Sequence, residues 1–329
     1  MTSRIGLAVL DTLVPRSASI LFLHRFAVPH LGVRGHDPRI LADHLEYLRA
    51  HNYHLMSVSD MLDHVEHDIP LERPALVFTV DDGYADFATE AAPVFAAYDC
   101  PVTVFLITDF VAGKLWNWFD RVEWAFRESD RHALDLEIGH LRFVLYWNDV
   151  IQREAATTRI IEALKKVPDA LKEEKILELA QALEVDLPSR SPSRDRAMTW
   201  EEVRGCARSG VTFGAHTVTH PILSQVDDKR AEAEIAGSWN AILSETTASV
   251  PVFCYPNGTP GDFSAREKSI IRGLGMKAAL STVPGSVRSS RGELKLPDPY
   301  SVPRFSYNED KRSFMQIASG LQALRDRPS

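Results

Sequence analysis

Cysteine is scarce in this 329-residue chain, and basic residues are not in excess. The three cysteines, Cys100, Cys206 and Cys254, are too far apart in sequence for a zinc knuckle or a disulfide framework. Lysine and arginine total 37 against 45 acidic residues, which gives a formal net charge of −8. Because such a chain lacks the basic surface that binds a phosphate backbone, we expect no nucleic-acid partner.

Long apolar runs are also missing. No run approaches the roughly 18 residues that a membrane-spanning helix requires, so we expect no transmembrane segment. The N-terminal stretch MTSRIGLAVLDTLVPRSASI places Asp11 and Arg16 around a short apolar run and has no small-residue cleavage site, so it does not match a secretory signal. The expected location is the cytoplasm, with attachment to a membrane surface left open.

The sequence does have a globular composition and an alternation of strand-like and helix-like segments. Hydrophobic residues make up 45% and charged residues 25%, which suits a chain with a sizeable core. Apolar and β-branched runs predict strands at 18–24, 53–58, 76–80, 102–107, 211–215, 250–255, 278–282 and 300–305. Helical spacing of apolar residues predicts helices at 40–50, 87–98, 199–209 and 229–243, with Asp86 capping the second and Thr199 with Glu202 capping the third. This alternation is typical of a parallel sheet with crossover helices, and the strands are numerous enough for a barrel.

The alternation is interrupted between Phe110 and Arg196. This stretch begins with an aromatic cluster at 116–126, continues with charged helical segments such as 171–183, and ends in a proline- and serine-rich run at 188–193. We therefore expect one domain over residues 1–329 that carries a mainly helical insertion at about 110–196. Insertions that follow a strand end lie on the site face of a barrel, so this one should form part of the wall of the cleft.

Polar side chains follow two of the predicted strands. Asp81 and Asp82 come directly after 76–80, and adjacent carboxylates repel each other unless a cation or a proton lies between them. His216 and His220 follow 211–215, and their spacing allows both imidazoles to reach one ion. Alone, the carboxylate pair more often marks a helix cap followed by a turn, and the histidine pair more often lies on a surface or in a core. Together they make a site of two histidines and one carboxylate, which suits Zn²⁺ or another divalent metal.

A turn follows the strand predicted at 250–255. Proline and glycine in Tyr255-Pro256-Asn257-Gly258 force a tight change of direction. The segment is either a plain turn or a source of N–H groups aimed at a developing oxyanion.

These segments resemble a known family. In this order, TVDDGYAD, HTVTHPILS and FCYPNG are similar to the first three motifs of the polysaccharide deacetylases, the NodB-homology family also called carbohydrate esterase family four. LFLHRF, HLEYLRAHNYHLMSVSDML and WNWFDRVEWAF extend the resemblance over about 18–305. The resemblance implies a distorted (β/α) barrel of about seven parallel strands that hydrolyses N-acetyl, sometimes O-acetyl, groups of sugars with one divalent metal. It also assigns the site residues: Asp81 as catalytic base, Asp82, His216 and His220 as metal ligands, and Tyr255, Pro256, Asn257 and Gly258 as acetyl pocket and oxyanion donor.

The chain departs from the family pattern in two places. Cys254 stands where the third motif often has an arginine that orients the base, and we expect Arg304 to replace that arginine unless it forms a surface ion pair. The family's last motif brings a catalytic-acid histidine late in the chain, but all twelve histidines here lie at or before His220. His24, at the end of the first predicted strand, is our expected proton donor, the alternative being a packed structural histidine.

The sequence thus predicts a metal-dependent hydrolase that removes an acetyl group from an N-acetylated sugar. Zn²⁺ is the expected ion, with Fe²⁺, Co²⁺, Ni²⁺ or Mn²⁺ as alternatives. Because no secretory signal is expected, the predicted substrate is a nucleotide- or lipid-linked precursor of a surface polysaccharide or glycolipid. Two alternatives stay open: a sugar-binding barrel that has lost turnover, and a related amidohydrolase that cleaves a C–N bond outside sugars.

Overall fold

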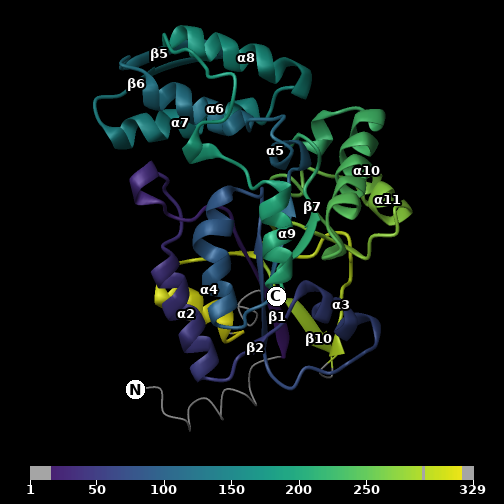
Figure 1. Cartoon of the computed structure of the whole chain (residues 1–329). Helices are drawn as coiled ribbons and strands as arrows, with labels where there is room; N and C mark the ends of the chain where they lie inside the picture. The colour runs from purple at the N-terminus through teal and green to yellow at the C-terminus, as the bar shows by residue number, and fades with distance from the viewer. Residues whose placement is uncertain (1–15, 291–292, 321–329) are drawn as a thin grey trace, which may run out of the picture.

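A curled, mostly parallel β-sheet forms the centre of the molecule (Figure 1). The structure is a computed structural model that describes residues 16–290 and 293–320, so most of the stretch inspected for a secretory signal, residues 1–15, lies outside the described residues. The sheet order is β11-β10-β1-β3-β4-β7-β8-β9, with β2 beside β3 and β12 beside β1. Its strands are β1 (Ser17–Leu23), β2 (His54–Leu55), β3 (Ala75–Val80), β4 (Val102–Leu106), β7 (Thr212–Ala215), β8 (Ser249–Cys254), β9 (Ala278–Leu280), β10 (Val287–Ser290), β11 (Glu293–Leu294) and β12 (Phe305–Ser306).

The chain segment around β12 closes the barrel. Val302 forms a parallel bridge with Leu280 of β9, and Phe305 pairs in parallel with Leu21 of β1. The strand expected at 300–305 is therefore shorter than predicted, because Pro303 has no N–H to pair and interrupts it. Six strands, β1, β3, β4, β7, β8 and β9, pair in parallel, and the segment that holds β12 joins β9 back to β1. The structure thus confirms the predicted distorted α/β barrel.

Helices cover the outside of the sheet. They are α2 (Pro38–Ala50), α3 (Val58–Glu66), α4 (Ala92–Ala97), α5 (Thr108–Val111), α9 (Trp200–Arg208), α10 (Asp228–Glu245), α11 (Ala265–Gly273) and α12 (Lys311–Ala318). The capping box predicted from Thr199 and Glu202 is present at the start of α9.

The predicted cap at Asp86 is wrong. Asp86 makes no capping bond, and its carboxylate instead accepts from the backbone N–H of Phe26 and from Nε of Arg25, at 2.8 and 2.7 Å. The helix expected at 87–98 begins as a π-helical turn at Phe87–Ala91 and continues as α4, because Pro93 cannot supply the usual N–H. Asp86 thus ties down the chain that follows β1.

The insertion forms a lobe above the barrel (Figure 1). We use "the lobe" for α6 (Trp118–Glu128), β5 (Ala133–Ile138), β6 (Leu141–Tyr146), α7 (Val150–Leu164) and α8 (Asp169–Ala182). It is mainly helical as predicted, but it also holds the β5–β6 hairpin, which was not expected. Its side chains pack into an apolar core of their own around Phe126, Trp147 and Leu179. No helix in 16–290 or 293–320 has the length and apolar character needed to cross a membrane.

Candidate active site

Two strand ends bring the three predicted metal ligands together. Asp82 follows β3, and His216 and His220 follow β7, which lies two strands away in the sheet. Nε2 of His216 lies 3.4 Å and Nε2 of His220 lies 3.6 Å from the same oxygen, Oδ1 of Asp82. All three side chains are buried, and the group has the geometry of a possible metal site. The structure therefore places the three residues as the sequence analysis expected.

The donor set fits a divalent cation. Oδ1 of Asp82 is buried and accepts no hydrogen bond, so the arrangement leaves a negative oxygen without a partner between two imidazoles. Nδ1 of His216 lies 2.7 Å from the carbonyl oxygen of Cys254, which leaves Nε2 to face Asp82. A backbone acceptor on the far nitrogen is the usual support of a metal-binding histidine.

The protonation of the three ligands follows from burial and from their neighbours. Burial would raise the pKa of Asp82, but the electrostatic attraction of His216 and of the other nearby histidines lowers it below its usual range. Burial lowers the pKa of His220 to about 3, so this imidazole is neutral at physiological pH, as a ligand must be. Burial would also lower the pKa of His216, but interactions with Cys254 and Asp82 outweigh this effect and raise the pKa well above its usual range. A cation bound at Nε2 would take the place of that proton.

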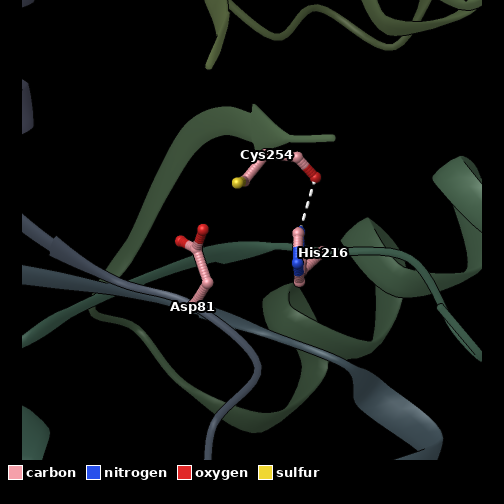
Figure 2. A group of neighbouring side chains, drawn as sticks. All are labelled: Asp81, His216 and Cys254. Atoms are coloured by element: carbon pink, nitrogen blue, oxygen red, sulfur yellow. Dashed lines mark hydrogen bonds between the residues drawn. The ribbon is translucent and has the colours of Figure 1, made fainter. Parts of the chain in front are cut away.

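A second group of candidate ligands shares His216 (Figure 2). Asp81, His216 and Cys254 also lie close enough to hold a metal ion. However, both oxygens of Asp81 already accept from Arg304, whose positive charge would repel a cation. Burial also raises the pKa of the Cys254 thiol, which disfavours the thiolate that binds metals. The group built on Asp82 is therefore the better metal site.

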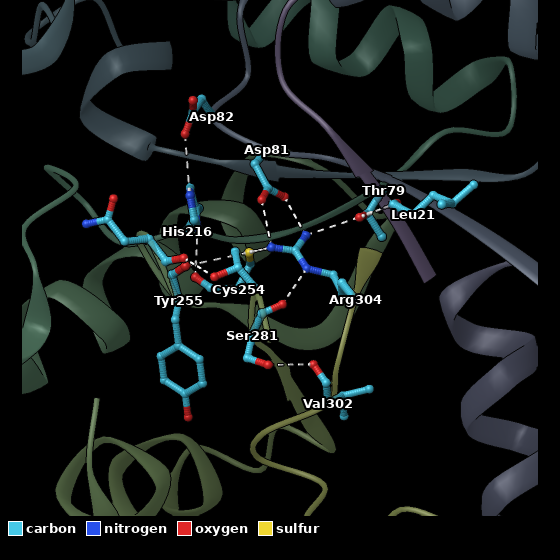
Figure 3. Close-up of polar contacts among 12 residues, drawn as sticks. Leu21, Thr79, Asp81, Asp82, His216, Cys254, Tyr255, Ser281, Val302 and Arg304 are labelled. Atoms are coloured by element: carbon cyan, nitrogen blue, oxygen red, sulfur yellow. Dashed lines mark hydrogen bonds and ion pairs between the residues drawn. The ribbon is translucent and has the colours of Figure 1, made fainter. Parts of the chain in front are cut away.

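Arg304 reaches Asp81 from the segment that closes the barrel (Figure 3). Its guanidinium is fully buried and donates to Oδ1 and Oδ2 of Asp81 at 2.9 and 2.8 Å. Its other bonds run to the oxygen of Ser281, to Oγ1 of Thr79 and to Sγ of Cys254. Burial would raise the pKa of Asp81, but Arg304 outweighs it and holds the pKa below its usual range. Arg304 thus forms a buried pair with Asp81 and not a surface ion pair.

Several site residues have strained backbones. Asp82, Thr217, His220 and Asn257 have φ values of 74°, 69°, 59° and 57°, in the left-handed region that residues other than glycine rarely adopt. Each such residue costs on the order of 1–3 kcal/mol and persists only where its surroundings hold it. Four of the eight such residues in the described chain thus lie at the strand ends that carry the polar groups.

The turn at 255–258 presents one free donor residue. The backbone N–H of Tyr255 donates to Leu280 and that of Gly258 to Pro256, while Pro256 has no N–H. Nδ2 of Asn257 is buried and has no hydrogen-bond partner, and Asn257 lines the same cavity as the metal ligands. Among the four residues expected here, Asn257 is the one with donors to offer.

A cavity of about 240 Å³ opens onto these groups. Asp81, Asp82, both ligand histidines, Tyr255 and Asn257 line it from the barrel, and Trp118, Phe119 and Ile161 line it from the lobe. A larger cavity of about 520 Å³ shares His24, Asp82 and Phe119 with it and continues along α6 and α7. The two make one cleft between barrel and lobe. His24 is exposed and lines both cavities, as its position at the end of β1 predicted.

The polar contacts between barrel and lobe were not predicted from the sequence. Oη of Tyr84 donates to Asp120 of α6 at 2.7 Å, and the guanidinium of Arg25 lies over the Tyr84 ring at 3.9 Å. The three residues belong to segments that resemble the family, but only the packing of α6 onto the barrel shows their role in fixing the wall of the cleft.

Comparisons with known proteins agree with this fold. Solved structures with the same fold include the deacetylase PplD of Streptococcus pyogenes in complex with acetate (16% identity, TM-score 0.57, covering 95% of this chain and 100% of that one). IcaB from Ammonifex degensii is similar at 16% identity and a TM-score of 0.56, covering 94% of this chain and 98% of that one. A de-N-acetylase from Aggregatibacter actinomycetemcomitans is similar at 13% identity and a TM-score of 0.56, covering 92% and 99%. At these identities the likeness concerns the fold.

The family itself is identified from the sequence. No curated protein matches the chain. The model of the family described as polysaccharide deacetylase matches residues 68–279, which is more than half of the chain and includes both carboxylates, both ligand histidines and the turn after β8. The chain therefore belongs to the polysaccharide deacetylase family.

Proposed function

We propose that the chain is a metal-dependent N-deacetylase that releases acetate from an N-acetylated sugar and leaves a free amine. The observation that carries the proposal is the buried Asp82 oxygen without a hydrogen bond, faced by two imidazole nitrogens at 3.4 and 3.6 Å, beside the Asp81–Arg304 pair. Membership of the family supports hydrolytic deacetylation of a carbohydrate. Zn²⁺ is the ion that we propose, because two histidines and one carboxylate suit it.

Asp82, His216 and His220 would hold the cation. When bound, a divalent cation supplies a Lewis acid that polarises the acetyl carbonyl and lowers the pKa of water toward neutrality. Asp81 is the proposed base. Arg304 holds its carboxylate ionised and fixed in direction, while each oxygen keeps a lone pair for the proton of the attacking water.

Two further groups complete the proposed chemistry. Asn257 would donate to the oxygen of the acetyl group as negative charge develops on it, from its backbone N–H and from Nδ2. His24 would protonate the departing nitrogen, because an amine leaves slowly without a proton. The proton taken up by Asp81 and the one given by His24 balance the hydrolysis to acetate and amine.

The lobe is the proposed determinant of substrate choice. Phe119 stands where the two cavities meet, with its ring edge-on to His220 at 5.5 Å. Arg153 and Thr157 of α7 line the larger cavity on the side away from the metal ligands. A substrate longer than one sugar would therefore contact both barrel and lobe.

An acetate-release assay tests the proposal. Protein loaded with Zn²⁺ is offered N-acetylated and O-acetylated sugars in free, nucleotide-linked and lipid-linked forms, and acetate and free amine are both measured. We expect equal amounts of the two products from at least one N-acetylated sugar. Sugar binding with no acetate release would favour the sugar-binding alternative, and release of acetate without amine would identify an esterase.

A further inference from the structure

The segment between the two ligand histidines is not a helix, although the histidines have helical spacing. β7 ends at Ala215, and Thr217 and His220 then adopt left-handed backbone angles. For a β-branched residue such as Thr217 this conformation is a true outlier. The position of His220 therefore depends on whatever holds this loop in place.

His220 needs that support more than His216 does. The His216 ring is fixed by its own contact from Nδ1 to the oxygen of Cys254. Nδ1 of His220 is buried without any hydrogen-bond partner, and its ring only packs edge-on against His216 and Phe119. Apart from the contact of Nε2 with Asp82 at 3.6 Å, no polar group orients this ring, so its position depends on the backbone that carries it.

The loop is held from two sides. The backbone N–H groups of Thr108 and Asp109 donate to the oxygens of Thr217 and Val218, and a buried carboxylate from α10 accepts from the N–H groups of the loop. Glu234 is 2% exposed, and its Oε2 accepts from the backbone N–H groups of Val218 and Thr219, both at 2.8 Å. Its Oε1 accepts from Oγ1 of Thr219 at 2.7 Å and pairs with Arg230 at the same distance. The bonds to Glu234 thus reach the two residues that lie between Thr217 and His220.

This contact is separate from the packing that docks α10 onto the sheet. Ala231, Ile235, Trp239 and Ile242 bury the apolar face of the helix in the main core. In the described chain, the carboxylate of Glu234 bonds to the ligand loop and to Arg230. Burying a carboxylate is costly unless it is paired and hydrogen-bonded, and here Arg230 and the groups of the loop supply these partners.

We propose that Glu234 is a positioning residue that fixes the loop between the metal ligands and so sets the affinity of the site for its cation. The inference rests on the proposed metal site. Glu234 does not touch the reacting groups, and it acts through the backbone of residues 218 and 219. Supporting contacts of this kind typically change metal affinity by about 10–100-fold when they are removed.

The test measures cation binding, not turnover. The dissociation constant for Zn²⁺ is measured by competition with a chromophoric chelator, and the visible absorption of the Co²⁺ form reports the ligand geometry. We expect Glu234→Ala to weaken Zn²⁺ binding by about 10-fold or more and to alter the Co²⁺ spectrum. We expect Glu234→Gln to bind Zn²⁺ more tightly than Glu234→Ala, because its amide oxygen can still accept both N–H groups, although its NH₂ cannot pair with Arg230.

A matched control separates positioning from stability. Ile235→Ala removes a fully buried side chain from the next position of α10, so it destabilises the fold without touching the loop. We expect Ile235→Ala to bind Zn²⁺ as tightly as the wild type. If Glu234→Ala does not fold, Glu234→Asp takes its place, since the shorter side chain cannot reach both N–H groups, and several-fold weaker binding is then expected.

The outcomes are distinct. Wild-type affinity in the folded Glu234 variant, or an equal loss in Ile235→Ala, would overturn the positioning role. Absence of Zn²⁺ binding by the wild-type protein would instead overturn the metal site of the proposed function.

Discussion

Removing the arginine that reaches Asp81 should cost more stability than most single substitutions. In Arg304→Met the fully buried carboxylate of Asp81 loses both of its charge-assisted bonds, while the apolar side chain fills much of the same space. Breaking a buried ion pair in this way costs about 3–5 kcal/mol. For a chain of 329 residues, roughly 1.5 °C of unfolding midpoint corresponds to 1 kcal/mol, so we expect the midpoint to fall by about 4–7 °C.

The double variant tests the cause. In Asp81→Asn/Arg304→Met neither charge remains buried alone, so we expect about 2 kcal/mol or more to be recovered relative to Arg304→Met. Arg39→Met, at an exposed arginine that pairs with Asp37, is the control and should leave the midpoint unchanged. Thermal and urea unfolding measure all three variants. A midpoint for Arg304→Met within 1 °C of the wild type, or a double variant less stable than the single one, would refute the reasoning.

Three further outcomes are expected from the cleft. His24→Gln should lower acetate release by about 10²-fold or more with the cation still bound, and wild-type turnover would reassign the proton donor. Thr157→Trp should lower kcat/KM for oligosaccharides about 10-fold but leave kcat/KM for single sugars unchanged. Ala155→Trp, which lies outside both cavities, is the control and should change neither value. An equal loss for both substrates would contradict a subsite in the lobe. Burial raises the pKa of Asp120 well above its usual range, so the folded chain binds a proton there and loses stability as pH rises above about 4. Asp120→Asn removes this pH dependence, so the unfolding midpoint of the variant, relative to that of the wild type, should rise between pH 4 and pH 7. A constant difference between the two midpoints over this range would show that Asp120 is ionised in the folded wild type.

Part of the site could be predicted because its residues follow strand ends. Asp82 and His216 lie far apart in the sequence, but parallel strands place their carboxyl ends at one edge of the sheet. The apolar runs of β1, β3 and β4 were also sufficient to locate the strands, because each is almost fully buried.

Other features depend on contacts that leave no local pattern. The contact of Arg304 with Asp81 joins positions 223 residues apart and follows from closure of the barrel. Asp86 has the sequence context of a helix cap, yet its carboxylate accepts hydrogen bonds from Arg25 and Phe26.

The hairpin in the lobe, by contrast, could have been predicted from the sequence. Buried and exposed residues alternate along Ala133–Ile138, and Gly139 allows the turn.

The role of Glu234 could not be predicted from the sequence either. In the sequence it is one charged position on an amphipathic helix, and helical spacing alone cannot tell a buried carboxylate from an exposed one. The left-handed angle of Thr217 is equally hidden, because a β-branched residue rarely adopts it. Backbone N–H groups that require an acceptor become visible only when the loop has a structure.

The metal content of the purified chain tests the central claim most directly. Zinc bound per chain is measured by mass spectrometry after reconstitution with Zn²⁺ and dialysis, for the wild type, for His216→Ala, and for His140→Ala at an exposed position of the lobe. We expect one zinc ion per chain in the wild type and in His140→Ala, and none in His216→Ala, which should still fold because a ligand at a strand end is not part of the core. Zinc retained by His216→Ala, or absent from the wild type, would contradict the central claim.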